Sequence, residues 1–354
     1  MKKSKSLIEK KFNAYQDSLV LQQSDLSLES ISAMVRSGAI DISPKYQRRE
    51  RWTEKKESDL IESFILNIPV PPIYLAEDKY GKYSVIDGKQ RITAINNFLS
   101  EKFKLGELEK FSELNDLSFN QLPDSIQNAL KIRPYLRVVT LLKQSHTELK
   151  YEVFLRLNKA GVALNPQEIR NVAFRGDLND LLFELSSLPY FVKIFGNNVK
   201  SKVYKEMIDI QFCLRFFTVR EYWDDFGGNM DLAMDDFMKL YFECSKKDVL
   251  EFKKIFERSL HACEVIWGDK AFQKPNSSRR VLQGMYEIQM VCISFLSDDQ
   301  LKKVIAKKSK VRVLLESEIN KNIEFADALT QFTSNPKNMK LRISTFLEIL
   351  KGIK

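Results

Sequence analysis

The sequence is poor in histidine, and this scarcity excludes several classes of metal-dependent enzyme. Only two histidines, His146 and His261, occur among the 354 residues, and they lie far apart. A histidine-rich metal site, a zincin helix or a His-Asn-His nuclease centre each requires histidines within one local motif. None of these centres can be built from the two histidines present.

Cysteine is also scarce, and its spacing argues against a disulfide framework or a zinc site. The four cysteines, Cys213, Cys244, Cys263 and Cys292, lie at least nineteen positions apart, and no C-x-x-C pair occurs. Each stands in an apolar context typical of a helix. This pattern predicts reduced thiols in the core of a cytoplasmic protein.

Long apolar runs and two common nucleotide-binding motifs are absent as well. The most apolar stretches, 181–192 and 284–296, are interrupted by Glu184 and Glu287, and a bilayer span requires about 20 apolar residues. The basic start of the chain is not followed by the apolar core of a signal peptide. No G-x-x-x-x-G-K-[ST] or G-x-G-x-x-G occurs, so neither a P-loop nor a dinucleotide-binding fold is supported. We expect a cytoplasmic protein with no membrane partner.

The composition is that of a globular protein with a moderate positive charge. Hydrophobic residues make up 44% and charged residues 29% of the sequence, and the formal net charge is +9. The charge permits a polyanionic partner, such as a nucleotide or a nucleic acid, without requiring one. Six basic residues occur within 302–312, a run that favours a solvated helix face over nucleic-acid contact.

Hydrophobic periodicity divides the chain into parts of different character. Residues 1–20 are an N-terminal extension, 21–110 mix short helices with short strands, and 111–354 are mostly helical. The predicted strands are 39–42, 73–76, 83–86 and 136–142. The predicted helices include 27–36, one capped by Thr53 and running to residue 65, one from residue 88 to 99, and one over 147–159. The fold class is therefore α+β, with a small mixed domain before a larger helical one.

The most informative segment is the junction between the predicted strand at 83–86 and the helix that follows. The strand ends in Asp87-Gly88, and Lys89-Gln90-Arg91 opens the helix. Free backbone N–H groups and the helix dipole at such a junction stabilise an anion, most naturally a phosphate. Gly88 would permit a close backbone approach or a positive φ.

The side chains around this junction suit phosphate chemistry. Lys89 and Arg91 add fixed positive charge, and arginine can bind two phosphate oxygens at once. Asp87 is suited to holding Mg²⁺ or orienting a water molecule, and Gln90 could position the same water. The same polar residues could instead only cap the helix, and spacing alone leaves both interpretations open.

Four elements in order resemble a known prokaryotic family. Val85-Ile86-Asp87-Gly88-Lys89-Gln90-Arg91 resembles the D-G-Q-Q-R motif of a ParB/sulfiredoxin-like domain, which forms the N-terminal part of GmrSD-type modification-dependent restriction enzymes. Tyr46-Gln47-Arg48 with Trp52 resembles the Y-Q-R…W element of that family. The segment 60–74 resembles its next helix and proline-led strand, and 154–168 resembles a later F-x-R-x-N…G…L…E element. The four elements lie within residues 40–175.

This resemblance implies a fold, an activity and a set of site residues. The expected fold is a small ParB-like α/β domain, the nucleotide-binding domain at 21–110, joined to a helical domain. The expected activity is Mg²⁺-dependent hydrolysis of a nucleoside triphosphate in defence against phage or modified DNA. Asp87, Gln90 and Arg91 are the expected catalytic residues, and Asp87 would hold the metal. The expected nucleotide-binding residues are Gln47, Arg48, Gly88, Lys89, Arg91, Thr93, Arg156 and Asn158.

Two departures from the family pattern bear on function. Lys89 replaces the first glutamine of the motif and adds a positive charge that can attract phosphate. The C-terminal half contains only one histidine, His261, and so cannot supply the His-centred nuclease module of larger relatives. The expected partners are a nucleoside triphosphate, DNA and a separate nuclease subunit. Two alternatives stay open: a non-catalytic nucleotide- or DNA-responsive module that acts through a partner nuclease, and a nuclease of ParB-like type.

Overall fold

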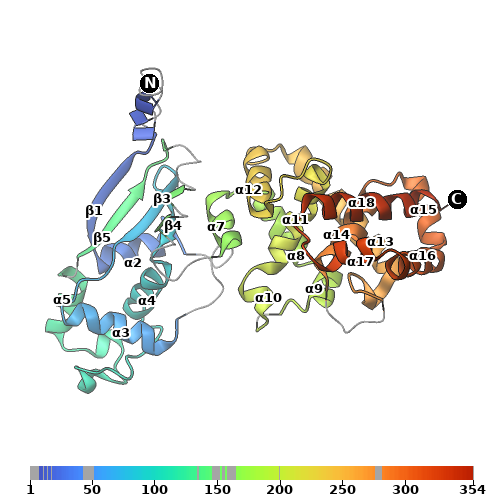
Figure 1. Ribbon diagram of the computed structural model, residues 1–354. Coiled ribbons are helices and arrows are strands. Elements are labelled where there is room, and N and C mark those ends of the chain that lie inside the picture. The colour runs from blue at the N-terminus through green and yellow to red at the C-terminus, as the bar shows by residue number, and fades with distance from the viewer. Residues whose placement is uncertain are drawn as a thin grey trace. The chain divides into compact units, whose positions relative to one another are not determined.

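The chain forms two compact units in the computed structural model. The structure describes residues 8–10, 12, 13, 15, 16, 18–42, 52–133, 135–145, 152, 153, 156, 157, 165–198, 200–275 and 281–353. The first unit is Met1–Asn165 and the second is Pro166–Lys354. The first combines a sheet with helices and the second is helical, as the α+β prediction requires (Figure 1).

The first unit is built around a mixed sheet. Its described elements are β1 (Leu21–Ser27), α2 (Leu28–Arg36), β2 (Ile40–Asp41), α3 (Glu54–Ile65), β3 (Ile73–Lys79), β4 (Lys82–Asp87), α4 (Lys89–Leu99), the 3-10 turns η1 (Ser112–Leu114) and η2 (Phe119–Gln121), α5 (Asp124–Ile132) and β5 (Tyr135–Leu141). The strand order is β1-β5-β3-β4-β2. The β1–β5 and β3–β4 pairs are antiparallel, whereas β3–β5 and β2–β4 are parallel.

The position of β5 changes the expected division of the chain. A boundary after residue 110 would assign 135–141 to the helical domain, but β5 lies between β1 and β3 in the sheet. Both edges of β5 are hydrogen-bonded to strands of the first unit. The division therefore falls after Asn165, because a strand paired on both edges cannot belong to a separate domain.

Strand β1 was not predicted from the sequence, and its position explains why. Its sequence, LQQSDLS, alternates poorly and carries no β-branched residue. It is an edge strand, mostly exposed, which pairs only with β5. Across that pair Arg137 donates to Asp25 at 2.9 Å. Pairing with a neighbour that is distant in sequence, rather than local pattern, therefore determines this strand.

Helices α2, α3 and α4 pack together beside the sheet and enclose the core (Figure 1). The α4 residues Ile92, Ile95 and Phe98 are fully buried with Ile73 and Val85 of the strands. The predicted cap of α3 is confirmed, because the Thr53 side chain accepts a hydrogen bond from the backbone of Lys56. Burial of one face of α4 thus fixes where its first turn lies.

The second unit is a bundle of helices. Its described elements are α7 (Pro166–Ala173), α8 (Asp177–Ser186), α9 (Pro189–Phe195), α10 (Lys202–Lys205), α11 (Ile208–Tyr222), α12 (Met230–Leu240), α13 (Lys246–Trp267), the turn η3 (Gly268–Lys270), α14 (Gln283–Ser294), α15 (Asp298–Ala306), α16 (Lys308–Lys321), α17 (Ile323–Thr330) and α18 (Pro336–Lys351). Helix α14 is central: it contacts α11, α13, α17 and α18 and is buried from Gly284 onward.

Several buried charged groups of the second unit form ion pairs. The carboxylate of Glu287 on α14 accepts from Arg215 at 2.5 Å and from Arg342 Nε at 2.7 Å, and all three side chains are buried. Buried Arg170 pairs with Asp231 and Asp235. The apolar stretch 284–296, interrupted by Glu287, is therefore a core helix that carries a buried ion network.

Several further sequence predictions concern the second unit. Cys213, Cys263 and Cys292 are buried free thiols, and Cys244 is partly exposed and free. Burial raises the pKa of the Cys213 and Cys263 thiols well above the usual range, so these thiols stay protonated. The basic side chains within 302–312 are exposed, as the prediction of a solvated face requires. Within the described part of the chain, no helix combines the length and the apolarity that crossing a membrane demands.

Candidate functional site

The predicted junction between strand and helix is present, and a single glycine forms it. Strand β4 ends at Asp87 and α4 begins at Lys89, so only Gly88 separates them. Gly88 has φ 93° and ψ 13°, a left-handed conformation that favours glycine. A Cβ atom at this position would lie 2.9 Å from Ile73 Cγ1. Both the backbone conformation and the close approach to β3 therefore require glycine here.

Arg91 is the most constrained polar side chain of the site. Its Nη2 donates to Asp87 Oδ2 at 2.5 Å, while its Nη1 donates to the carbonyl oxygens of Pro71 and, at 3.0 Å, of Pro72. The Arg91 side chain is only 12% exposed, whereas that of Asp87 is 43% exposed. Arg91 therefore joins the first turn of α4 to the proline-led entry of β3, and it neutralises the accessible carboxylate of Asp87.

These contacts leave part of the guanidinium available. Arginine has five N–H donors, and the three contacts of Arg91 use both Nη1 hydrogens and one on Nη2. Among the described residues, Nε and the second Nη2 hydrogen have no partner. Arg91 can thus hold its present contacts and still donate to an oxyanion beside Gly88.

Gln90 links the motif to the segment that precedes α3. Its Oε1 accepts a hydrogen bond from the backbone N–H of Trp52 at 3.3 Å. The Trp52 ring packs against the core of the first unit, which agrees with a structural role for this residue. Lys89 and Thr93 lie in the first two turns of α4, both half-buried. Gln90 therefore holds the backbone of Trp52 against the first turn of α4.

The remaining expected nucleotide-binding residues are not all described. Gln47, Arg48 and Asn158 lie outside the described residues. Arg156 is described, and it pairs with Glu152 at 2.7 Å with its side chain 76% exposed. The part of the predicted site that the structure brings together therefore consists of Asp87 to Arg91 with Thr93.

The donor set permits a metal ion only together with a ligand. The described residues contain no cluster of three or more His, Cys, Asp or Glu side chains that could hold a metal ion. Mg²⁺ is commonly bound by one or two carboxylates together with substrate phosphates. The Asp87 side chain is 43% exposed, and one of its carboxylate oxygens accepts a hydrogen bond from Arg91. Asp87 therefore fits the role of the single carboxylate ligand in such a shared site.

Sequence reasoning missed the partners that hold Arg91 in place. The carbonyl oxygens of Pro71 and Pro72 accept hydrogen bonds from Arg91, and the side chain of Ile73 lies against Gly88. The proline-led strand itself was identified in the sequence. Backbone acceptors, however, carry no residue-specific pattern, so no feature of the sequence could assign them to Arg91.

Comparison with known proteins supports the resemblance. Residues 28–175 match the family model of the GmrSD restriction endonuclease, N-terminal domain. This range starts at α2 and ends after α7, and it includes the Gly88 junction. No curated protein matches the chain, and no solved structure does. Residues 28–175 are therefore similar to the N-terminal domain of GmrSD restriction endonuclease.

Proposed function

We propose that the GmrSD-type domain binds a nucleoside triphosphate at the first turn of α4 and hydrolyses it with Mg²⁺. The observation that carries the proposal is the Gly88 junction, where a left-handed glycine lies against Ile73 and starts a helix of eleven residues. The first N–H groups of a helix lack intrahelical partners and bear partial positive charge. Next to them stand Lys89 and the remaining donors of Arg91, which gives the site the character of a phosphate cradle.

The roles of the side chains follow from their contacts. The backbone N–H groups after Gly88, with Lys89 and Arg91, bind and orient phosphate oxygens. Asp87 is held by Arg91 with its carboxylate accessible, so it can accept a hydrogen bond from an attacking water and orient it. Bound Mg²⁺ would neutralise charge on the phosphates, with Asp87 as its protein ligand. Gln90 keeps the Trp52 segment against this turn, and Thr93 lies one turn further along α4.

DNA is the partner that a restriction function requires. The matched family is that of a restriction endonuclease, and the chain carries a net charge of +9. We propose that nucleotide turnover in the first domain is coupled to a response to foreign or modified DNA, with cleavage by a separate nuclease subunit. The small number of histidines in this chain supports a separate subunit.

One observation favours a second candidate, a nucleotide-responsive module without turnover. The guanidinium of Arg91 contacts the carboxylate of Asp87 directly, and a guanidinium so placed competes with a metal ion for the carboxylate oxygens. Binding would then persist in Asp87→Asn, and no phosphate would be released by either protein. Hydrolysis by the wild type distinguishes the two candidates.

The test is a binding titration of the full chain with each of the four ribonucleoside triphosphates in the presence of Mg²⁺. Gly88→Ala should weaken binding by at least about tenfold, because the added methyl group displaces the first turn of α4 from Ile73. Gly81→Ala is the matched control: Gly81 also has a positive φ, 71°, but a Cβ atom added there would have no other atom within 4 Å. A melting curve of each variant establishes that it is folded.

Equal affinities for wild type and a folded Gly88→Ala variant would overturn the assignment of the site. If Gly88→Ala does not fold, Lys89→Gln replaces it, since Lys89 is half-buried on the first turn and supplies one of the positive charges of the proposed site. That variant should lose affinity for triphosphate more than for nucleoside.

A further inference from the structure

A large cavity lies within the second unit, remote in sequence from the α4 site. Its volume is about 1260 Å³, above the ~300–1,000 Å³ usual for small-molecule sites. Its lining comes from α9, α11, α13, α14, α16 and α17 and the connections between them. Neither the family resemblance nor the proposed function uses it.

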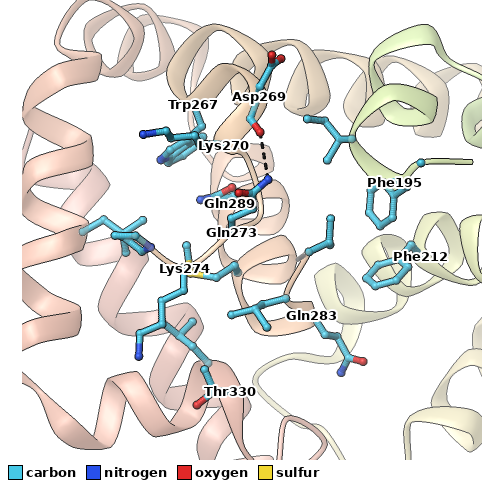
Figure 2. A pocket seen from close by; sticks show the side chains of 18 of the residues that line it. Phe195, Phe212, Trp267, Asp269, Lys270, Gln273, Lys274, Gln283, Gln289 and Thr330 are labelled. Atoms are coloured by element: carbon cyan, nitrogen blue, oxygen red, sulfur yellow. Dashed lines mark hydrogen bonds between the residues drawn. The ribbon is translucent and has the colours of Figure 1, made fainter. Parts of the chain in front are cut away.

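A buried amide at this cavity lacks a partner for its donor. Gln289 on α14 is 0% exposed, and its Oε1 accepts from the backbone N–H of Phe272 at 2.7 Å. Its Nε2 is buried and has no hydrogen-bond partner among the described residues. Gln289 is one of the lining residues, and in the view of Figure 2 its side chain lies between Phe195 and Phe212 on one side and Trp267 and Lys270 on the other. An unsatisfied buried donor is costly to leave unpaired, and a ligand acceptor would satisfy it.

Aromatic rings and positive charge complete the lining. The Phe195 and Phe212 rings lie 4.7 Å apart between centroids, and Trp267 lines the cavity across from them. Four cationic side chains line it, Lys193, Lys270, Lys274 and Arg312, against the two acidic ones, Asp269 and Glu316. Lys193 already pairs with Asp269 at 2.6 Å. The cationic side chains of the lining thus exceed the acidic ones by two.

The cavity wall is held rigidly by the buried ion network. Arg342, paired with Glu287, also donates to the carbonyl oxygens of Ala328 and, at 2.6 Å, of Thr333. These carbonyls flank Leu329 and Thr330, which line the cavity with Thr333. On the facing helix, a Cβ at Gly284 would lie 2.4 Å from the carbonyl oxygen of Leu329. Close packing and ion pairing thus fix the α14–α17 wall in place before any ligand binds.

We infer that this cavity binds a phosphorylated ligand with an aromatic ring, of nucleotide class, with the ring against the phenylalanines and an acceptor on Gln289 Nε2. Bases stack on aromatic side chains irrespective of sequence, and phosphate is attracted by the cationic excess. Two sources share this chemistry: a free nucleotide, and a nucleotide unit of a DNA strand. The site is independent of the α4 site, because every lining residue belongs to the second unit.

Tryptophan fluorescence of the full chain separates the two sites. The chain has three tryptophans: Trp52 lies beside Gln90 and Trp267 lines the cavity. The probes are ATP, GTP and a 5′-phosphorylated single-stranded DNA 12-mer. Quenching that survives Trp52→Phe but is lost in Trp267→Phe reports the cavity. Quenching with the opposite pattern reports the α4 site, so the two proposals fail separately.

The substitution Gln289→Glu tests whether the unpaired Nε2 group of Gln289 donates a hydrogen bond to the ligand. Glutamate retains the acceptor that Phe272 requires and replaces the donor by an acceptor, so affinity should fall about tenfold or more. Arg312→Gln, an exposed change at the rim, should weaken binding about two- to fivefold. Lys310→Gln on the same helix, which is exposed and lies outside the cavity lining, is its matched control.

The outcomes are distinct. Quenching of Trp267 by ATP or GTP assigns the cavity to a free nucleotide, and quenching by the 12-mer alone assigns it to a DNA strand. No quenching of Trp267 by any of the three probes overturns the inference. Unchanged affinity in both Gln289→Glu and Arg312→Gln overturns it as well, and the Arg312 variant keeps the test valid if Gln289→Glu does not fold.

Discussion

The α4 site and the cavity of the second unit are built in opposite ways. The α4 site occupies one turn of the chain, from Asp87 to Arg91, and its charged groups Asp87 and Arg91 are already paired with each other. The cavity collects side chains from Lys193 to Thr333, and its most buried polar group, Gln289, has an unpaired donor among the described residues. A site made from consecutive residues can be recognised as a motif in the sequence. One assembled from distant helices can be recognised only in the folded chain.

The two sites also differ in what holds them. At α4, a glycine conformation and two backbone carbonyls position Arg91. Around the cavity, a buried network of Glu287 with two arginines supports the wall. The α4 site should therefore be sensitive to single changes in backbone geometry, whereas the cavity should be sensitive to the loss of buried charge.

The largest expected effect is the loss of the Glu287 charge. Glu287→Gln leaves Arg215 and Arg342 buried without a compensating carboxylate, which should lower the free energy of unfolding by about 3–5 kcal/mol. Urea denaturation followed by circular dichroism measures this change. Glu184→Gln is the control, because the Glu184–Lys253 pair is partly exposed to solvent, and solvent screening leaves such pairs with little effect on stability. Equal effects of the two changes would show that the wall does not depend on the network.

The next effect concerns Gly88. Alanine at this position must adopt a positive φ and approach Ile73, so it should cost roughly 2–3 kcal/mol of stability. Gly81→Ala imposes a similar φ without the close approach and should cost about 1 kcal/mol. Thermal denaturation of both variants measures the difference. Identical melting temperatures would mean that β3 can move away from α4 and make room for the added methyl group.

The hydrogen bonds of Glu62 should make the stability of the first unit sensitive to acid. Burial raises the pKa of Glu62, but three backbone N–H groups, of Lys110, Phe111 and Glu109, outweigh it and lower the pKa overall. A carboxylate with a lowered pKa stabilises the fold fully above about pH 4.3, the ordinary value for glutamate. This contribution is lost as the pH falls through the lowered value.

The measurement for Glu62 is the midpoint of acid unfolding of the first unit. Glu62→Gln cannot ionise, so its stability should vary less with pH below about 4.3 than that of the wild type. Glu113→Gln, at the 3-10 turn of the same segment, serves as the control because Glu113 is exposed. If the stabilities of the wild type and of Glu62→Gln changed with pH in the same way, the Glu62 carboxylate would not be what holds residues 109–111.

The smallest expected effect on stability is that of Asp87→Asn. The Asp87 carboxylate is 43% exposed, and Arg91 keeps the carbonyl oxygens of Pro71 and Pro72 as acceptors when the carboxylate is replaced by an amide. Thermal denaturation should therefore show little change from the wild type. A large loss of stability would mean that the Asp87–Arg91 pair serves mainly to hold the fold, which would weaken the comparison between the two sites.

Local pattern was sufficient to predict most elements near the α4 site. The Thr53 cap, the strands at 73 and 83 and the helix after Gly88 follow from capping, proline placement and apolar spacing. By contrast, β1 and the central position of β5 depend on pairing between distant segments. Local sequence carries no information about such pairing, and this is why the expected boundary fell too early.

The candidate sites follow the same division. Asp87, Gly88 and Arg91 could be identified because they lie within five consecutive residues that resemble a family motif. The acceptors of Arg91 are backbone carbonyls, and the cavity depends on Gln289, Phe212 and Trp267, which are isolated in the sequence. A buried glutamine in an apolar helix is unremarkable until its neighbours show that its donor is unpaired.

The most direct test of the central claim is phosphate release by the full chain. Wild type and Asp87→Asn are incubated with Mg²⁺ and each of the four ribonucleoside triphosphates, with and without DNA. We expect release from at least one nucleotide by the wild type, and a loss of about 100-fold or more in the folded Asp87→Asn variant. Release of no phosphate by the wild type, or equal release by both proteins, would contradict it.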